Sequence, residues 1–259
     1  STLINDVLDL SKIEAGKLEI VAENCNVIAI VEDTAVSLSS QAFDKNINLE
    51  FDVTEIEHFS LKLDSGRLIQ ILNNLIGNAL KFTLRGGVYI SARTRLINKN
   101  VRLEVDIQDT GIGIAKDLQS KLFQSFTQAD NSISSEFGGT GLGLSISKQL
   151  CELMGGEISV VSEKDKGSTF SFYIDTDSEV AKALPDTKIL HQTAFKLMLC
   201  DDYIQKKWEN SIRYFGGVVD SEKPDYYVVD CHHSEYQLIK DKEEILSRSI
   251  FLSRHSETY

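Results

Sequence analysis

The sequence predicts an α+β protein, in which a mixed sheet carries helices on one face and a small second domain follows. Apolar and polar residues alternate as in strands at several places along the first two thirds of the chain, with helix-like apolar spacing between them. A strand–helix–strand order after residue 195 predicts a small parallel sheet for the second domain. The apolar fraction of 42% over 259 residues is sufficient for well-buried cores.

The first element is a helix that is expected to end at Gly16. Leu3, Val7 and Leu10 follow the alternating four- and three-residue spacing of a coiled coil, and glycine is a common helix stop. The alternative is an amphipathic helix that packs on its own domain. Because the chain begins within this pattern and without a methionine, we expect it to be part of a longer protein.

Seven later segments of the first domain have the alternation of strands. Turns are expected at residues 98–100 and 164–167, and each joins two strands into a hairpin. The expected strands are residues 17–20, 47–51, 60–63, 88–93, 103–107, 157–162 and 168–174.

Four segments show the spacing of core-facing helices. Asp64 or Ser65 is the expected N-cap of the helix that starts near residue 65, and Gly155 ends the helix that starts near residue 141. A polar, glycine-ended stretch, residues 127–139, lies between the third and the fourth. The helices are expected at residues 26–42, from about 65 onward, at 116–126 and from about 141 onward.

A linker is expected at residues 176–195, because residues 175–188 show no apolar period and include Pro185. Residues 196–259 then form the second domain. Its expected elements are a strand at 196–200, a helix at 208–215 and a strand at 226–229.

Composition excludes several classes of protein. The formal net charge of −12 and the lack of a basic cluster argue against a nucleic-acid partner. No apolar run approaches the length of about 20 residues that spans a membrane. The four cysteines are too widely spaced to indicate a zinc site or a disulfide framework, so we expect a reducing, cytoplasmic setting. They are Cys25, Cys151, Cys200 and Cys231.

Three motifs in one continuous domain predict an ATP site. Residues 138–144 (Gly-Gly-Thr-Gly-Leu-Gly-Leu) precede a helix, and such a run offers backbone N–H groups and a positive dipole end to triphosphate oxygens. Residues 109–114 (Asp-Thr-Gly-Ile-Gly-Ile) follow a strand, and residues 74–83 lie on a helix. A glycine run alone is commonplace, whereas the three elements in this order are a strong signal.

The helical motif supplies candidate phosphate and metal contacts. Asn74 and Asn78 are four residues apart and therefore share a helix face. A neutral amide oxygen suits Mg²⁺ that is bound to nucleotide phosphates, and Asn78 is the better candidate. Lys81 can place a positive charge near the phosphates, and Phe82 can offer its ring to a purine. The alternative is that both asparagines only satisfy buried backbone groups.

The strand-end motif supplies a candidate base contact. The Asp109 carboxylate can accept a hydrogen bond from the exocyclic amine of adenine, while Gly111 and Gly113 permit a sharp turn beneath the base. Thr169 is expected to help hold Asp109 or a bridging water, with sheet packing as its alternative role. A strand-end Asp-Thr-Gly is otherwise often only a turn. Phe123 and a second phenylalanine three residues later either flank a mobile lid or pack on the core.

These motifs, together with residues 122–130 (Leu-Phe-Gln-Ser-Phe-Thr-Gln-Ala-Asp), resemble the catalytic ATP-binding domain of sensor histidine kinases, a mixed-sheet α/β sandwich of the GHKL class. The resemblance covers about residues 17–174. Residues 8–17 are similar to the end of the second dimerisation helix in hybrid members of that family. The resemblance implies that residues 1–16 are the end of that helix and that residues 17–175 form the catalytic domain.

The resemblance also implies roles for individual residues. Asn78 is then the magnesium ligand, and Asn74 is its partner where related GHKL ATPases carry a glutamate base. Asp109 is then the adenine contact, and the glycine run is the lid hinge. The expected cofactor-binding residues are Asn78, Phe82, Asp109, Gly111, Gly113, Gly139, Thr140, Gly141, Leu142, Gly143 and Thr169, with Asn74 and Lys81 as catalytic residues.

Two departures from the family pattern matter. All five histidines lie downstream of the second dimerisation helix, so the helix with the phosphoacceptor histidine is absent from this sequence. Residues 134–137 (Ser-Ser-Glu-Phe) occupy a lid segment where many relatives carry arginine or lysine, which removes a cation near the γ-phosphate.

The second domain resembles a receiver domain, of the flavodoxin-like fold, only in part. Asp201 and Asp202 follow its first strand like an acidic metal pair, and Asp230 stands where a receiver has its phosphorylatable aspartate. Residues 216–224 are too short for a second strand plus a second helix. We therefore expect an incomplete or degenerate receiver that packs against the kinase rather than one that accepts phosphate, with a loose likeness to BarA/GacS-type sensors.

The expected function is that of the cytoplasmic kinase core of a hybrid sensor histidine kinase in a two-component system. With ATP and Mg²⁺ it would phosphorylate a histidine on a helix of the same or a partner protomer, and a response regulator or phosphorelay domain would follow. The full-length protein would be a homodimer anchored in the inner membrane. The alternatives are a different GHKL ATPase, which Asn74 in place of an acidic residue disfavours, and a pseudokinase scaffold.

Overall fold

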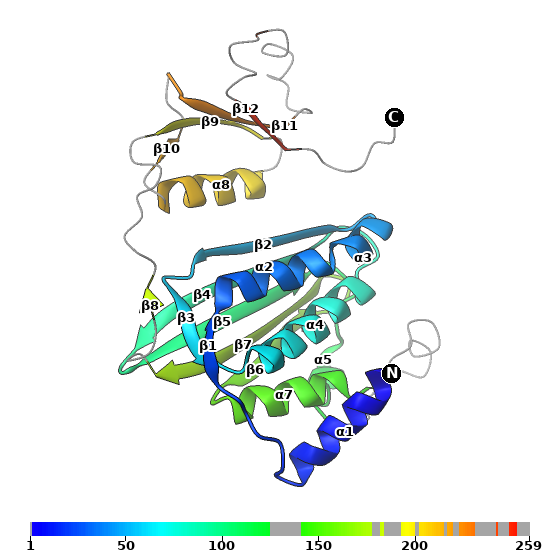
Figure 1. The fold of residues 1–259 in the computed structure, drawn as a ribbon. Coiled ribbons are helices and arrows are strands. Elements are labelled where there is room, and N and C mark those ends of the chain that lie inside the picture. The colour runs from blue at the N-terminus through cyan, green and yellow to red at the C-terminus, as the bar shows by residue number, and fades with distance from the viewer. Residues whose placement is uncertain are drawn as a thin grey trace. The chain divides into compact units, whose positions relative to one another are not determined.

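The computed structural model describes residues 2–124, 141–177, 182–183, 193–199, 202–214, 217–219, 223–230, 242 and 249–252. The chain divides into two compact units, residues 1–183 and 184–259 (Figure 1). The larger unit contains all of the described motif residues.

The larger unit is built on a five-stranded sheet in the order β2-β4-β5-β7-β6. Strands β2 and β4 are parallel and the other neighbours are antiparallel, which confirms the expected mixed sheet. Both expected hairpins are present, as the pairs β4–β5 and β6–β7. The strands are β2 (Asn48–Glu55), β4 (Gly87–Ile97), β5 (Asn100–Asp109), β6 (Glu157–Glu163) and β7 (Gly167–Asp177).

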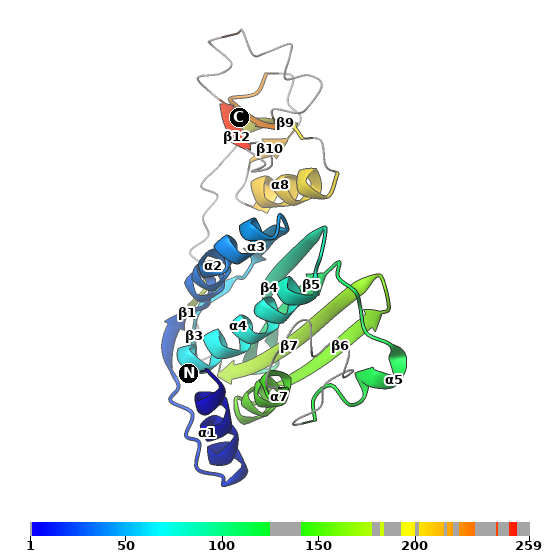
Figure 2. The same cartoon turned by 90° about the vertical axis from the view of Figure 1, so that its right-hand side faces the viewer.

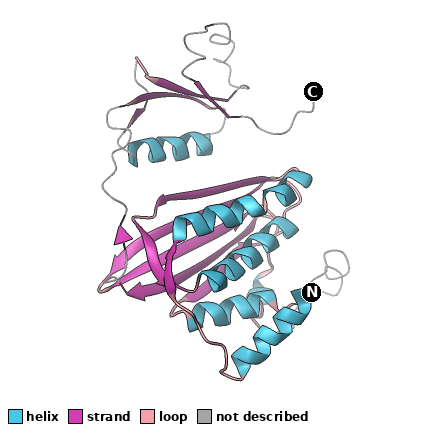
Figure 3. Ribbon diagram, in the orientation of Figure 1, coloured by secondary structure: helices cyan, strands magenta, loops and turns pink. Residues whose placement is uncertain are grey.

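Three helices cover one face of this sheet, with α4 (Ser65–Phe82) between α2 (Val27–Ser37) and α7 (Gly143–Leu153) (Figures 1 and 2). Colouring by secondary structure shows the same separation into a helical layer and a strand layer (Figure 3). Helix α4 packs its leucines and isoleucines at three- and four-residue spacing against inward-facing strand residues such as Val105 and Ile107. The helix with the two asparagines is therefore fixed at the centre of the core.

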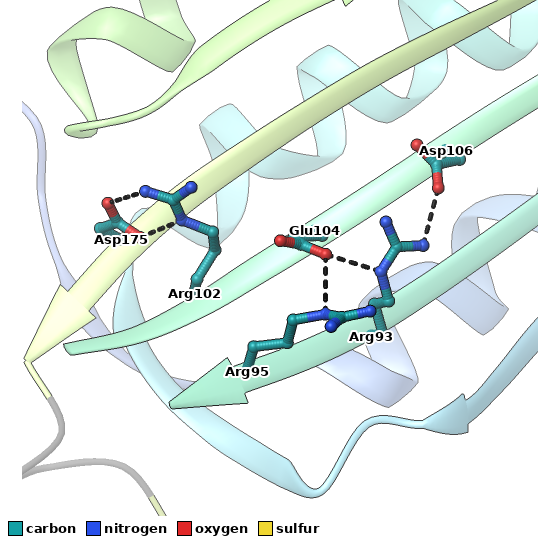
Figure 4. Close-up of polar contacts among 6 residues, drawn as sticks. All are labelled: Arg93, Arg95, Arg102, Glu104, Asp106 and Asp175. Atoms are coloured by element: carbon teal, nitrogen blue, oxygen red, sulfur yellow. Dashed lines mark hydrogen bonds and ion pairs between the residues drawn. The ribbon is translucent and has the colours of Figure 1, made fainter. Parts of the chain in front are cut away.

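The opposite face of the sheet is polar and carries ion pairs (Figure 4). Arg93 lies between Glu104 and Asp106, at 2.6 Å from the first through Nε and 2.8 Å from the second through Nη1. Arg102 makes two hydrogen bonds of 2.8 Å to the carboxylate of Asp175. One apolar and one polar face is the usual pattern of an antiparallel sheet. The candidate site residues lie on the other face, which the helices cover.

The segment before the sheet differs from expectation. Helix α1 (Thr2–Glu14) ends near Gly16, which has a positive φ of 62°. Residues 17–22 are irregular, although a strand was expected at 17–20. Apolar and polar residues alternate here because Leu18 and Ile20, which are half-buried, pack against the core. The segment itself pairs with no neighbouring strand. Leu10 is buried in the unit's own core, as in the alternative expectation for this helix.

A second, three-stranded sheet follows, in the order β1-β3-β8. The antiparallel strand β3 pairs with both of its neighbours. Strand β8 belongs to the stretch that was expected to be a linker. The strands are β1 (Glu23–Asn26), β3 (His58–Leu63) and β8 (Lys182–Ala183).

Two expected helices are interrupted or shortened. The helix expected at 26–42 is divided at Leu38 into α2 and α3 (Ser39–Asp44), with Asn26 as the N-cap of α2. The helix expected at 116–126 is only α5 (Lys116–Gln119). It continues to Gln124 as turns with hydrogen bonds three residues apart, a tighter geometry that rarely persists in long runs.

The smaller unit contains a four-stranded parallel sheet in the order β10-β9-β11-β12. Its core includes Phe195, Leu197, Ile212 and Val228. The expected strand–helix–strand unit is confirmed. Within residues 216–224, Val218 and Val219 pair with β9 as a short strand, and the described residues of this stretch contain no second helix, in line with the expectation that it is too short for both. The elements are β9 (Ala194–Met198), α8 (Asp202–Tyr214), β10 (Val218–Val219), β11 (Tyr226–Asp230) and β12 (Ser249–Leu252).

Asp64 is the N-cap of α4, and this role yields a stability prediction. Its Oδ1 accepts a hydrogen bond of 3.0 Å from the Arg67 backbone N–H, and its Oδ2 accepts one of 2.9 Å from Val21 N–H. We expect Asp64→Ala to lower the free energy of unfolding by about 1–2 kcal/mol, measured by urea denaturation. Ser65→Ala is the matched control, since this exposed residue makes no cap bond, and a cost equal to that of Asp64→Ala would contradict the assignment.

Candidate functional site

Helix α4 presents the residues of the helical motif on one face. Asn74, Asn78, Lys81 and Phe82 are spaced by four, three and one residues, so they lie along a single stripe over two turns. All four are half-buried. The stripe runs from the middle of the helix to its C-terminal end.

The N-terminus of α7 meets this stripe at Asn74. A Cβ atom on Gly143 would lie 2.1 Å from Asn74 Oδ1, so a larger residue here would displace the Asn74 side chain from its position. One turn further along α7, the Ser147 hydroxyl accepts a hydrogen bond of 2.8 Å from Asn74 Nδ2. Gly141 has a positive φ of 69°, which is the left-handed conformation that glycine adopts at low cost.

The first turn of α7 is suited to an anion. Leu142 occupies the N-cap position and makes no side-chain cap hydrogen bond. Backbone N–H groups at the start of a helix carry positive partial charge and bind phosphate oxygens when no side chain caps them. The site therefore places an amide pair beside a potential phosphate cradle.

Asp109 lies at the end of β5 and is only 5% exposed. Burial raises the pKa of its carboxyl, and hydrogen bonds from the Gly111 N–H and from the backbone and hydroxyl of Ser168 offset this only in part. The Gly111 N–H lies 2.8 Å from Oδ1. A carboxylate held this way retains acceptor capacity for a ligand N–H group.

The loop after Asp109 packs on the end of α4. A Cβ on Gly111 would lie 2.5 Å from the carbonyl oxygen of Phe82 and 2.8 Å from Asp109 Oδ1. The Ile112 N–H also donates to the Phe82 carbonyl, at 3.3 Å. Because Phe82 is one helical turn beyond Asn78, this contact links the loop after Asp109 to the part of α4 that carries Asn78.

Ser168, rather than Thr169, holds Asp109. Thr169 pairs with Gln108 in the β5–β7 ladder, and so it points to the face of the sheet opposite Asp109. Ser168 is the direct partner of Asp109. The expected contact of Thr169 is therefore wrong by one residue. Counting the strand register from Gly167, the glycine at the β6–β7 turn, would have identified Ser168.

The loop after Asp109 is fixed to the β6–β7 hairpin. Gly113 has a positive φ of 62°, and a Cβ on it would lie 2.0 Å from the Glu163 carbonyl oxygen. The Ile114 N–H donates to Ser162 Oγ at 2.8 Å, and Gln119 Nε2 donates to the carbonyls of Ile114 and Ser162, also at 2.8 Å. Sequence reasoning missed Ser162 and Gln119, because both act through contacts distant in the chain.

Lys81 lies at the C-terminal end of the stripe. Its ammonium is 4.8 Å from the centre of the Phe82 ring. Burial lowers the pKa of Lys81, and the nearby charge of Lys45 lowers it further. Lys45 itself donates hydrogen bonds to the carbonyls of Leu80 and Lys81, at 2.8 and 3.1 Å, and was not anticipated from the sequence.

Other expected site residues are placed only in part. Phe123 packs edge-on against Phe170 at 6.5 Å between ring centres, which is the core-packing alternative. Gly139, Thr140, the lid residues 127–139 and Asp201 lie outside the described residues. Asp202 begins α8 and Asp230 ends β11, and only their backbones are described.

The donor set of this site is compatible with a magnesium ion held chiefly by phosphates. The described part of the chain contains no group of three or more His, Cys, Asp or Glu side chains that could hold a metal by themselves. Asn78 offers a neutral amide oxygen, and Mg²⁺ at nucleotide sites commonly takes one or two protein oxygens plus phosphate and water. Within the same residues, no helix is long and apolar enough to cross a membrane.

Comparison with known proteins agrees with this geometry. Residues 63–178 match the family described as histidine kinase-, DNA gyrase B-, and HSP90-like ATPase. The chain is 45% identical over 176 residues to the signal transduction histidine-protein kinase BarA of Escherichia coli K12, a match over 68% of this chain and 19% of BarA. It is 44% identical over 191 residues to the sensor histidine kinase GacS of Pseudomonas protegens, over 73% of this chain and 21% of GacS.

A solved structure aligns with most of the chain. Full-length ShkA in complex with AMPPNP aligns over 97% of this chain and 54% of ShkA, with a TM-score of 0.76 and 27% identity. The chain spans about a fifth of the length of BarA and GacS, the curated relatives that it matches.

The family match begins just before α4 and ends just after β7, so it contains the asparagine pair, Asp109 and the glycine run of α7. Residues 63–178 of this chain therefore match the histidine kinase-, DNA gyrase B-, and HSP90-like ATPase family, and the chain is similar over about two thirds of its length to parts of the histidine kinases BarA and GacS.

Proposed function

We propose that this chain binds ATP with Mg²⁺ and transfers the γ-phosphoryl group to a histidine on a separate helix. The observation that supports the proposal is the contact of the loop after Asp109 with the end of α4, one helical turn beyond Asn78, which links a buried carboxylate to a helix that carries a candidate oxygen ligand for a cation. The relatives BarA and GacS, named as histidine kinases, support the choice of a histidine as acceptor.

Asp109 selects the base in this proposal. Its carboxylate accepts a hydrogen bond from the exocyclic amine of adenine. Guanine carries a carbonyl oxygen at the same ring position, so it would face the carboxylate with a second acceptor. A buried polar group left without its partner is costly, which favours adenine over guanine.

The other residues position and neutralise the triphosphate. The N–H groups at the start of α7 receive phosphate oxygens, and Lys81 adds positive charge from α4. The amide oxygen of Asn78 would hold Mg²⁺, which when bound neutralises phosphate charge. Catalysis then consists mainly of orientation and charge compensation.

Asn74 favours transfer to histidine over hydrolysis. By the resemblance to GHKL proteins, other ATPases of this class carry a glutamate base at this position. An amide cannot take a proton from water, so water is not activated here. A neutral imidazole needs no such base to attack phosphorus. This distinction disfavours the alternative of a gyrase- or chaperone-like ATPase.

The wider context is also a proposal. Residues 1–16 are the end of a dimerisation helix, residues 17–175 the catalytic domain and residues 176–195 a linker. The complete protein is a cytoplasmic-facing kinase that acts as a homodimer, anchored in the inner membrane, and passes phosphate to a response regulator or phosphorelay domain.

Asp109→Asn tests the base contact. We expect the affinity for a non-hydrolysable ATP analogue, measured by calorimetry with Mg²⁺, to fall by roughly 10- to 100-fold, because a hydrogen bond to a charged group is lost. The preference for adenine over guanine analogues should fall with it. Asp106→Asn is the matched control, since this residue lies on the same strand but points to the outer, ion-paired face.

The pH dependence of binding gives a second measurement for the same residue. Burial raises the pKa of Asp109, so its carboxylate is lost at a higher pH than that of an ordinary aspartate near 3.9. Affinity should therefore weaken as pH falls toward this raised value. The Asp109→Asn protein lacks this component, so identical pH profiles, or unchanged affinity at pH 7, would exclude the assignment.

Measuring phosphoryl transfer to histidine distinguishes an enzyme from a pseudokinase scaffold. The scaffold is the alternative because the lid segment lacks the cation that many relatives carry there. Mixing this protein and labelled ATP with a separate dimerisation helix that carries the acceptor histidine should yield acid-labile phosphohistidine. Asn78→Asp should abolish the label, because a carboxylate there repels the phosphates. ATP binding without any transfer would instead support the scaffold.

The smaller unit is proposed to be a degenerate receiver. Its parallel order β10-β9-β11-β12 corresponds to the 2-1-3-4 part of the flavodoxin-like order and supports this fold. We expect acetyl phosphate with Mg²⁺ to leave Asp230 unlabelled, as measured by mass spectrometry. Labelling that maps to Asp230 would show an active receiver instead.

A further inference from the structure

Ser147 lies on the face of α7 that packs against α4. It is 2% exposed, and it follows Gly143 by four residues, so both meet Asn74. Its Oγ accepts the hydrogen bond of 2.8 Å from Asn74 Nδ2. The hydroxyl therefore contacts the asparagine pair from α7, through Asn74.

The Asn74 amide continues this hydrogen bond to Asn78. Asn74 Oδ1 accepts a hydrogen bond of 3.4 Å from Asn78 Nδ2. The three side chains therefore form a relay in which each amide donates in the same direction, from Asn78 to Asn74 to Ser147. With Nδ2 of Asn78 engaged, its Oδ1 is the end of the amide that is left for a ligand.

The hydrogen bond to Ser147 limits the movement of the Asn74 side chain. A serine hydroxyl can both donate and accept, so the contact holds the Asn74 amide in place against Asn78. A divalent cation binds oxygen and is repelled by an amide NH₂ group, so Asn78 must keep its oxygen outward to hold Mg²⁺.

We propose that Ser147 is a positioning residue that holds Asn74, and through it the Asn78 amide, in place for the cation of bound Mg·ATP. This inference rests on the proposed function and adds a residue that acts without touching the nucleotide or the metal. Because Ser147 is on α7 and Asn78 on α4, the metal ligand is set only when the two helices are packed together.

The test compares nucleotide affinity with and without the cation. The dissociation constant for a non-hydrolysable ATP analogue is measured by calorimetry in saturating Mg²⁺ and again in EDTA, and their ratio reports the contribution of the metal. Ser147→Ala should reduce the ratio by roughly two- to tenfold, the equivalent of one hydrogen bond. Affinity in EDTA should match that of the wild type, since adenine binding at Asp109 is untouched.

Two variants separate positioning from general packing. Cys151→Ala removes another buried side-chain group from α7, two turns beyond the segment proposed to bind phosphate, and should keep the wild-type ratio. Ser147→Thr keeps a hydroxyl and should restore the ratio. Thermal unfolding confirms that each variant is folded, and the threonine variant keeps the comparison decisive if the alanine variant is unstable.

The outcomes distinguish this inference from the function beneath it. A wild-type protein that binds the analogue with a clear Mg²⁺ effect, together with an unchanged ratio in Ser147→Ala, overturns the inference alone. Equal loss of affinity in Mg²⁺ and in EDTA assigns Ser147 to packing and also overturns it. A wild-type protein that binds no analogue overturns the proposed function and the inference together.

Discussion

The close packing of α7 on α4 at Gly143 is the contact on which the site depends. With a Cβ on this residue only 2.1 Å from Asn74 Oδ1, any larger side chain would displace the Asn74 amide. The close approach brings the N–H groups of the α7 N-terminus beside an amide pair on α4, and it lets Ser147 reach Asn74. Under the proposed function, a single missing methyl group thus keeps the candidate phosphate-binding turn of α7 next to the candidate cation ligand of α4.

Asp109 shows how the same fold gives up stability for recognition. Its burial raises the pKa of the carboxyl, so the charged form is less favourable in the folded chain than in water, even with donors from Gly111 and Ser168. Under the proposed function, the acceptor capacity that these donors leave on the carboxylate is available to an N–H group of the ligand.

Local patterns in the sequence predicted most of the fold, because α4 and the two hairpins are specified by periodicity and turns within a few residues. The prediction failed where a partner far along the chain decides the outcome. Apolar and polar residues alternate at 17–20 because Leu18 and Ile20 pack against the core, and no strand pairs with this segment. The choice of Ser168 over Thr169 depends on the β5–β7 register, and the roles of Ser147 and Lys45 depend on contacts between elements that no single segment encodes.

The identity of residue 74 connects geometry and chemistry. In this structure Asn74 accepts a hydrogen bond from Asn78 and donates one to Ser147. A glutamate could also accept from Asn78, and the serine hydroxyl could donate to it, but a glutamate could in addition take a proton from water. Under the proposed function, the amide at residue 74 therefore keeps these contacts while it removes the base that would activate water for hydrolysis.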